Sequence, residues 1–467
     1  MRIGYNIKRL QDIERARLIS RNFEAHEKWS RQELEQYQQQ QFQVLIKHAM
    51  GASPFYRQLY SDVRVDQPVR VERLPIITKK MMMENFDRFV TDPRLKLYNL
   101  QAHLEQLKQD EYYLGEYRVV TTAGTSGLKG VFAYNRQEWS TVLASVLRGI
   151  SFVGITPRFP DRVRIAAIEA SSPRHMTYRA AVSLDVGLFN ILRLEATSRI
   201  EDLVSELDAF QPEVMQGYPS IIALLAVGQI EGRLNIHPHI ISTGSEVRTE
   251  GMEEKIRQAW GVNPFNAYGT SEGLFGSSCS DHCGIVLFED LGIVEVVDEQ
   301  NQPVQDGSPG YKILFTNLFN YTQPLIRYEV TDLVTISTEP CPCGQPFRHI
   351  SKIEGRSDDI IYLKGQQGES VPVHPIIFRG TMASIAAVKE YQVVYDERGI
   401  HILIVPQAGA SHERAASKIQ ELLKGQLESL GTVVPGIDIQ FRERIERESK
   451  LMGKLKLVAS KGTGSAV

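Results

Sequence analysis

The stretch Val163-Arg164-Ile165-Ala166-Ala167-Ile168 decides the fold class, because it is a short apolar run of the kind that forms a buried strand. Similar runs lie at Arg118-Val119-Val120 and at Ile240-Ile241-Ser242-Thr243, and helix-like stretches separate the three. Strands that alternate with helices in this way predict βαβ units. The sequence therefore predicts a large layered α/β domain.

The stretch 291–334 has a different pattern. The strand-like runs 293–297 and 311–315 flank the turn residues Asp306-Gly307-Ser308-Pro309-Gly310. Two such runs around a glycine- and proline-rich turn predict an antiparallel hairpin with a longer connection. We expect a small β-rich subdomain here.

Both ends of the chain predict separate units. Residues from about 5 to 60 carry apolar side chains at helical spacing and predict an amphipathic helical segment. Strand-like runs start again at 360–363, 393–395 and 401–405, and a helix-forming stretch follows at 413–430. We expect a large N-terminal domain over 1–357, with a helical segment at 1–60. A small, mobile C-terminal α+β lid domain is expected over 358–467.

Composition excludes several classes of partner. Among 467 residues, 53 Lys and Arg oppose 56 Asp and Glu, so the formal net charge is −3 and favours neither nucleic acid nor an anionic membrane. No apolar run is long enough to cross a bilayer, and the N-terminus alternates charged with apolar residues, unlike a signal peptide. We expect a cytoplasmic protein with no membrane or nucleic-acid partner.

The most informative motif is Thr121-Thr122-Ala123-Gly124-Thr125-Ser126-Gly127-Leu128-Lys129-Gly130, which follows a strand-like run. Its glycines let backbone N–H groups approach a ligand and its hydroxyls add donors, a composition suited to polyphosphate. It lacks the Gly-Lys-Ser/Thr ending of a Walker loop. Flexible surface turns are also rich in glycine and hydroxyl residues, so such a turn is an equal alternative from this segment alone.

Two carboxylates are further candidates. Glu272 lies in Asn266-Ala267-Tyr268-Gly269-Thr270-Ser271-Glu272-Gly273, and a carboxylate near a phosphate loop can hold Mg²⁺ against ATP oxygens. Asp332 could accept hydrogen bonds from ribose hydroxyls. Taken alone, a solvated loop Glu and an Asp that caps a turn are the commoner explanations.

In this order the segments resemble the adenylate-forming superfamily of acyl-CoA synthetases, adenylation domains and luciferases, and in detail its phenylacetate-CoA ligase-like branch. The resemblance covers nearly the whole chain. Its most specific part is Gly355-Arg356-Ser357-Asp358-Asp359. Further matching segments are Pro54-Phe55-Tyr56-Arg57, Leu74-Pro75-Ile76-Ile77-Thr78-Lys79, Thr243-Gly244-Ser245-Glu246 and 326–333.

The resemblance implies ATP-dependent activation of a small carboxylic acid to an acyl-adenylate, release of pyrophosphate, and transfer to CoA. It implies that Glu272 helps to bind Mg²⁺, that Asp332 and Arg356 hold the ribose, and that Asp358 is a hinge. The residues implied to hold phosphates are Thr122, Gly124, Thr125, Ser126 and Gly127. Those implied to flank adenine and the acid are Gly244, Ser245, Glu246, Asn266, Ala267 and Tyr268, with Gly269 and Thr270 next to them.

A mobile cation is also implied. Negative charge grows on phosphate oxygens when an acid attacks the α-phosphate, so a positive group aimed there lowers the barrier. The resemblance implies Lys454 of Met452-Gly453-Lys454 as this catalytic group. Lys450 and Lys456 are close enough in sequence to compete for the role, and an exposed basic strand end is the structural alternative.

The four cysteines form two close pairs, Cys279 with Cys283 and Cys341 with Cys343. Such pairs in a reducing compartment are typical of tetrahedral thiolate ligation, for which Zn²⁺ is the default metal. His282 lies beside the first pair, and whether it replaces a cysteine is open. Buried inert cysteines are the alternative. We expect a structural zinc site.

The acceptor and the acid are less well defined. The segment 364–372, near which the resemblance places the thiol acceptor, is long and polar, so a carrier-protein thiol or an amine remains an alternative to CoA. Aromatic acids are favoured by the resemblance alone. A nucleotide-binding scaffold without catalysis is a third hypothesis. Candidate residues of the pocket wall are 173–178, Tyr218, Ser245 and Ala267.

Overall fold

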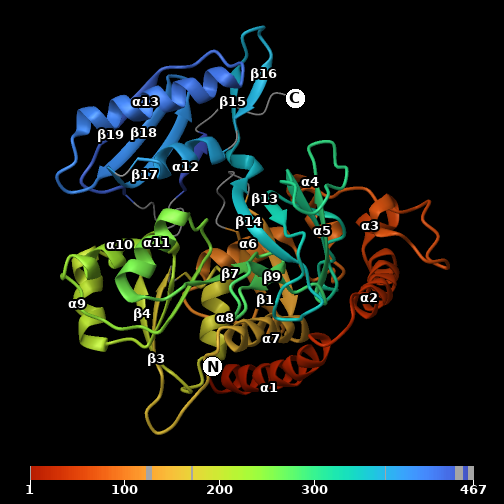
Figure 1. Cartoon of the computed structure of the whole chain (residues 1–467). Coiled ribbons are helices and arrows are strands. Elements are labelled where there is room, and N and C mark those ends of the chain that lie inside the picture. Colours follow the sequence, from red (N-terminus) through yellow and green to blue (C-terminus); the bar gives the residue numbers. More distant parts are fainter. Residues whose placement is uncertain are drawn as a thin grey trace.

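A computed structural model of the chain describes residues 2–122, 129–169, 172–373, 375–385, 387–446 and 456–460 (Figure 1). Nine of the described strands form the central sheet, in the order β13-β14-β9-β8-β7-β6-β5-β3-β4. Five of them are parallel: β3 (Arg164–Glu169), β4 (Asn190–Glu195), β5 (Val214–Gly217), β6 (Ile240–Gly244) and β7 (Phe265–Gly269).

Helices connect these parallel strands, as the alternating pattern predicts. They are α8 (Met176–Leu184), α9 (Ile200–Phe210), α10 (Pro219–Ile230) and α11 (Glu250–Trp260). The other half of the sheet is antiparallel and consists of β8 (Phe275–Ser277), β9 (Ile285–Leu287), β14 (His349–Arg356) and β13 (Asp332–Ile336). The expected layered α/β architecture is confirmed.

The chain reverses direction across this sheet next to β3. From β3 it moves outward to β4, and then returns to the other side of β3 to form β5, β6 and β7. Adjacent connections therefore leave β3 and β5 in opposite directions. A reversal of this kind opens a crevice at the carboxyl ends of the strands, where ligands bind in open α/β sheets.

Glycines at two of these carboxyl ends are required by close packing. A Cβ at Gly217 would lie 2.6 Å from the carbonyl oxygen of Ile168, and a Cβ at Gly244 would lie 2.7 Å from that of Ala267. Only glycine lets the neighbouring backbones approach so closely. Both glycines let the ends of neighbouring strands lie close together where the crevice begins.

The expected β-rich subdomain is present. Strand β10 (Gly292–Val297) pairs antiparallel with β11 (Lys312–Asn317), and β12 (Tyr328–Val330) adds to the other side of β11. A second hairpin, β1 (Tyr117–Thr121) with β2 (Val131–Asn135), flanks the glycine-rich motif. Residues 123–128 of that motif lie outside the described residues.

The N-terminal helical segment consists of three helices, α1 (Arg2–His26), α2 (Arg31–Ala52) and α3 (Pro54–Leu59). A capping box at Ser30 and Glu33 begins α2 and separates it from α1. Helix α1 packs along α7 (Arg136–Phe152) at the base of the molecule in Figure 1. Shorter helices follow: η1 (Val71–Arg73), α4 (Lys79–Glu84), α5 (Phe86–Phe89) and α6 (Leu97–Gln106).

The C-terminal part, in blue in Figure 1, is taken from the expected boundary within η2 (Ser357–Asp359) and has a hydrophobic cluster of its own, which includes Phe378, Ile402 and Leu423. Its sheet has the order β19-β18-β17-β20. The expected boundary at 357/358 remains a prediction. Its elements are β15 (Ile361–Lys364), β16 (Ser370–Val373), α12 (Pro375–Ala383), β17 (Val388–Asp396), β18 (Gly399–Pro406), α13 (His412–Ser429), β19 (Ile437–Phe441) and β20 (Val458–Ser460).

Within the described ranges, none of the helices combines the length and the apolar character that crossing a membrane requires.

Candidate active site

A cavity of about 550 Å³ lies at the carboxyl ends of the parallel strands. Gly217 of β5, Gly244 of β6 and Gly269 of β7 line it, so it coincides with the crevice that the strand order creates. One side of its lining carries charged and hydroxyl side chains, and another is apolar.

A hydrogen-bonded group of three residues from different strands forms part of the polar side. The Tyr268 hydroxyl donates to Asp332 Oδ2 at 2.5 Å, and Arg356 Nε donates to Asp332 Oδ1 at 3.1 Å. Asp332 and Arg356 are register partners across β13 and β14, which explains why they meet. Burial, and next Asp332, raise the pKa of Tyr268 well above its ordinary value, and Asp332 raises that of Arg356. A carboxylate fixed in this way can accept hydrogen bonds from a diol.

Glu272 is a buried carboxylate in the same lining, with 7% of the residue exposed. Its loop is tied on both sides, because Asn317 Nδ2 donates to the Glu272 carbonyl at 2.9 Å and the Tyr134 hydroxyl donates to that of Ser271 at 2.7 Å. Burial raises the pKa of Glu272, and the positive charge of Lys79 opposes the rise. The raised pKa indicates that more positive charge would be accommodated here.

Lys79 is a site residue that sequence reasoning did not single out. Ile77 pairs with the β12 region, since its N–H donates to the Arg327 carbonyl at 3.1 Å and its carbonyl accepts from Glu329 N at 2.9 Å. This pairing places Thr78 and Lys79, at the start of α4, in the cavity lining. The sequence signal was a Thr-Lys pair after an apolar segment, which is too common to identify a site alone.

The structure brings most of the predicted nucleotide-binding residues to one cavity. Among the described ones, Glu246 and Asn266 lie outside its lining. The Glu246 carboxylate accepts from Ser220 N at 3.2 Å and Oγ at 2.6 Å, and the backbone of Asn266 exchanges hydrogen bonds with Ser278. Gly124, Thr125, Ser126, Gly127 and Lys454 lie outside the described residues. The predicted residues in the lining are Thr122, Gly244, Ser245, Ala267, Tyr268, Gly269, Thr270, Glu272, Asp332 and Arg356.

The apolar side of the cavity comes largely from α7, which the sequence prediction of the pocket did not include. Val142, Val146 and Ile150 project from successive turns of this helix, and Gly149 leaves room between them. An apolar helix face that lines a pocket has the same pattern as one that packs in a core, so no sequence signal separates the two. Further apolar lining residues are Val153, Ile155, Met176, Ala180, Phe275 and Phe288.

The predicted wall is present in part. Residues 175–178, with Tyr218, Ser245 and Ala267, line the cavity, and His175 Nδ1 lies 3.1 Å from the Thr121 carbonyl oxygen. Pro173 and Arg174 do not contribute to the lining. Arg174 instead donates through Nη2 to the Glu105 carbonyl oxygen at 3.2 Å.

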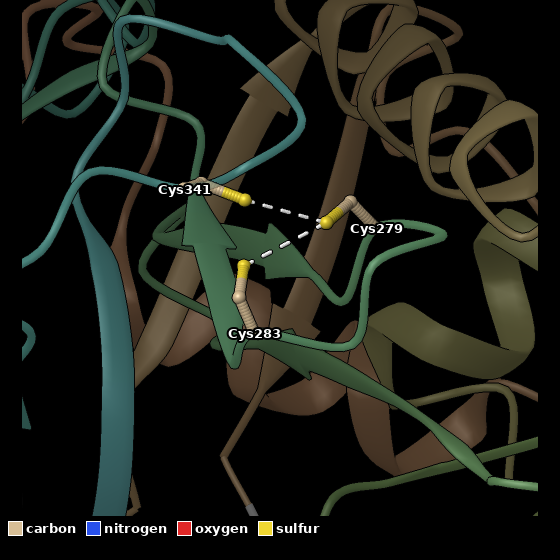
Figure 2. Close-up of side chains that lie close together, drawn as sticks. All are labelled: Cys279, Cys283 and Cys341. Carbon is tan, nitrogen blue, oxygen red and sulfur yellow. Dashed lines mark hydrogen bonds between the residues drawn. The ribbon is translucent and has the colours of Figure 1, made fainter.

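The four cysteines gather away from this cavity. Cys279 Sγ lies 3.7 Å from that of Cys283 and 3.4 Å from that of Cys341. Figure 2 shows the thiol of Cys279 pointing toward these other two. Cys341 Sγ lies 2.9 Å from that of Cys343. All are free thiols. Burial raises the pKa of Cys283 to about 11 and those of Cys341 and Cys343 to about 12. The pKa of Cys279 is lowered instead: burial alone would raise it, but hydrogen bonds from the Asp281 N–H and the neighbouring thiols outweigh that effect.

This cysteine cluster joins two loops that are far apart in sequence, and Leu34 of α2 and Phe347 pack against it. His282 is not among its grouped ligand atoms in the described residues. Its ring instead packs on Phe265, with centroids 4.3 Å apart, and its backbone has a φ of +52°. The structure thus separates His282 from the predicted ligand set.

The chain is similar in sequence to phenylacetate-coenzyme A ligases. A phenylacetate-coenzyme A ligase of Thermus thermophilus is 25% identical over 390 residues, which cover 79% of this chain and 80% of the relative. One of Pseudomonas putida is 27% identical over 354 residues, covering 71% and 72%. A scan against models of protein families found no match.

Solved structures show the same fold. A 2-hydroxyisobutyryl-CoA ligase in the postadenylation state, in complex with R3-HIB-AMP, superposes with a TM-score of 0.72 at 19% identity, covering 93% of this chain and 91% of that one. An anthranilate CoA ligase in complex with anthranoyl-AMP superposes with a TM-score of 0.52 over 72% of this chain and 65% of that one. The chain is therefore a homologue of the phenylacetate-CoA ligases, with the fold of the acyl-CoA ligases of the adenylate-forming superfamily.

Proposed function

We propose that the protein is an AMP-forming acid–thiol ligase that converts a small carboxylic acid and ATP into an acyl-adenylate and pyrophosphate, and then forms an acyl-CoA thioester. One observation carries this proposal. A single cavity joins a polar side with Glu272, Asp332 and Arg356 to an apolar side to which α7 contributes. The homology with phenylacetate-CoA ligases supports the same reaction class.

In the first half-reaction, a carboxylate oxygen attacks the α-phosphorus of ATP, and the bond to the bridging oxygen breaks as pyrophosphate leaves. Asp332 and Arg356 hold the ribose, and Thr122 with the following glycine-rich residues binds the phosphates. Lys454 and Lys79 supply positive charge to the phosphate oxygens. In the second half-reaction, a thiolate attacks the acyl carbon and AMP leaves.

Glu272 fits the role of a Mg²⁺ ligand. It is a buried carboxylate in the cavity lining, and burial raises its pKa, so a bound cation would stabilise its ionised form. When bound, Mg²⁺ neutralises charge on the phosphate oxygens of ATP.

The acid is small and apolar, with aromatic acids favoured. The apolar part of the cavity supports this, because Val142, Val146, Ile150 and Phe275 offer a carbon surface with few charges. A carrier-protein thiol or an amine is the alternative to CoA as acceptor. We propose that the C-terminal part, 358–467, turns about Asp358 to admit the acceptor.

The cysteine cluster fits a structural zinc site. Ligands at about 2.3 Å from tetrahedral Zn²⁺ lie about 3.8 Å from one another, close to the observed Cys279–Cys283 and Cys279–Cys341 separations. We propose Cys279, Cys283, Cys341 and Cys343 as the ligands, without His282. Free thiols suit a reducing compartment, so we propose a cytoplasmic location.

Acid-dependent ATP–pyrophosphate exchange over aromatic, aliphatic and amino acids tests the proposal, with mass spectrometry of the product formed with CoA. We expect exchange with one acid class and an acyl-CoA product. Lys454→Ala should abolish exchange and leave ATP binding largely intact. Exchange without any CoA-dependent product would favour the carrier or amine alternative, and the absence of exchange with every acid would refute adenylation.

A further inference from the structure

Two polar side chains, Gln216 of β5 and Ser242 of β6, lie next to each other in the lining of the cavity and form what we call the polar pair. The two residues are register partners in the parallel sheet, and both are half-buried. Among the described residues, neither the Gln216 amide nor the Ser242 hydroxyl forms a hydrogen bond. An amide and a hydroxyl that line a cavity without a protein partner are available to a ligand.

The polar pair lies on the face of the sheet that the end of α7 covers. Val214 precedes Gln216 by two residues on β5 and packs in one hydrophobic cluster with Val153 and Ile155, which follow α7 and line the cavity. Side chains two residues apart on a strand point to the same face. Met215, between them, packs instead in the cluster that contains α9 and α10. Gln216 and its register partner therefore belong to the apolar side of the cavity.

The polar pair also lies deeper than the strand ends where the nucleotide is proposed to bind. Gly244 follows Ser242 by two residues, which corresponds to about 6.6 Å along a strand. Gly244 is the register partner of Ala267, which directly precedes Tyr268 and its hydrogen bond to Asp332. The carboxyl group of the acid must face these strand ends to be adenylated. The other end of the acid then reaches the polar pair.

The charges around the polar pair favour a neutral group on the acid. Among the described residues that line the cavity, those of β5, β6 and α7 carry no charge. Glu169, at the end of the neighbouring strand β3, also lines the cavity, and its negative charge disfavours a second carboxylate on the acid. An amide and a hydroxyl together offer donors and acceptors, which a hydroxyl group of a ligand matches with its own donor and acceptor.

We propose that Gln216 and Ser242 are specificity-determining residues, which select acids with an apolar skeleton and a hydroxyl group at the end remote from the carboxyl group. This inference rests on the proposed function and names its substrate class. An acid without the hydroxyl would cover both side chains and replace none of the hydrogen bonds that they make to water. A site built to bind a hydroxyl therefore rejects the analogue that lacks it.

The test compares acids that differ only at their far end, by acid-dependent ATP–pyrophosphate exchange. The probes are the para-hydroxy, para-methyl, para-aminomethyl and para-carboxy forms of benzoate and phenylacetate, with ω-hydroxyhexanoate and hexanoate as the aliphatic pair. The variants are Gln216→Leu and Ser242→Ala. Ser145→Ala is the matched control, because Ser145 of α7 also lines the cavity but its hydroxyl donates to the Val142 carbonyl at 2.7 Å.

We expect the unaltered protein to prefer the hydroxy acid over its methyl analogue by about 10- to 100-fold in kcat/KM, the loss that an unpaired buried polar group causes. Each variant should reduce this ratio by about 10-fold. Gln216→Leu should also exchange the methyl analogue faster than the unaltered protein does, which damage to the fold would not produce. Ser145→Ala should keep the ratio of the unaltered protein.

Two results would overturn the inference and leave the proposed function intact. The first is exchange of the methyl, aminomethyl or carboxy analogue at least as fast as that of the hydroxy acid by the unaltered protein. The second is a hydroxyl preference that persists in both variants. Thermal unfolding checks the fold, and Ser242→Ala, which removes one oxygen, decides if Gln216→Leu melts early. If no acid supports exchange, the proposed function fails, and the inference fails with it.

Discussion

At the scale of single residues, the site contains groups that are proposed to act on phosphate and whose burial lowers the stability of the folded protein. Glu272 is the clearest case, because its burial raises its pKa. An acidic group whose pKa is higher in the folded state than in the unfolded state makes the folded protein less stable as the pH rises, because the group ionises first in the unfolded chain. The ionised form therefore costs stability at neutral pH when no ligand is bound.

Glu272→Gln should consequently raise the melting temperature of the ligand-free protein, and the difference from the unaltered protein should grow as the pH rises above about 4, the ordinary pKa of a glutamate. Exchange activity should fall by about 100-fold or more, because the variant loses the charge proposed to hold Mg²⁺. Thermal unfolding across pH and exchange assays check both effects. A variant that is destabilised at pH 8 would contradict this account of Glu272.

Lys79→Met tests the lysine that sequence reasoning passed over. Its charge opposes the raised pKa of Glu272 and it lines the cavity, so we expect exchange to fall by about 10- to 100-fold with weaker ATP binding. Lys47→Met, at an exposed position of α2, is the control. Equal rates in the two variants would remove Lys79 from the site.

At the scale of elements, the strands and helices were predictable and their contacts less so. The apolar runs at 163–168 and 240–243 became β3 and β6, and the stretch 413–430 became α13, because each carries its own periodicity. The meeting of Tyr268 with Asp332, 64 residues apart, depends on sheet pairing that no local pattern encodes. Residues 123–128 and Lys454 lie outside the described residues, so their proposed roles stay predictions.

The cysteine loops give a prediction at this scale. We expect the purified protein to contain about one zinc per chain by elemental analysis, and Cys341→Ser to lose most of it and to unfold at a lower temperature. His282→Ala should keep its zinc, because the ring packs on Phe265 instead of the thiols. Zinc loss in that variant would restore His282 to the ligand set.

At the scale of the whole molecule, contacts between the body and the C-terminal part set their arrangement. Lys255 of α11 donates to the Lys389 carbonyl of β17 at 3.0 Å, and burial lowers its pKa. If the C-terminal part turns between half-reactions, this contact belongs to one arrangement only.

Lys255→Ala should therefore slow exchange by about two- to twelvefold and leave thioester formation from preformed acyl-adenylate unchanged, since one hydrogen bond contributes about 0.5–1.5 kcal/mol. Gln258→Ala on the same helix is the control. The two assays run in parallel check the expectation. Equal slowing of both half-reactions would show that the contact does not discriminate between arrangements.

The two sides of the cavity have separate origins in the chain, and this separation has an evolutionary consequence. Asp332, Arg356 and Glu272 belong to the antiparallel half of the sheet and its loops, whereas Val142, Val146 and Ile150 of the apolar lining belong to α7. A Cβ at Gly149 of α7 would meet nothing closer than Ser277 at 3.9 Å, so the helix tolerates larger residues there. Descendants of this sequence can thus adapt to shorter or longer acids by changes on one helix, while the apparatus for ATP is inherited intact.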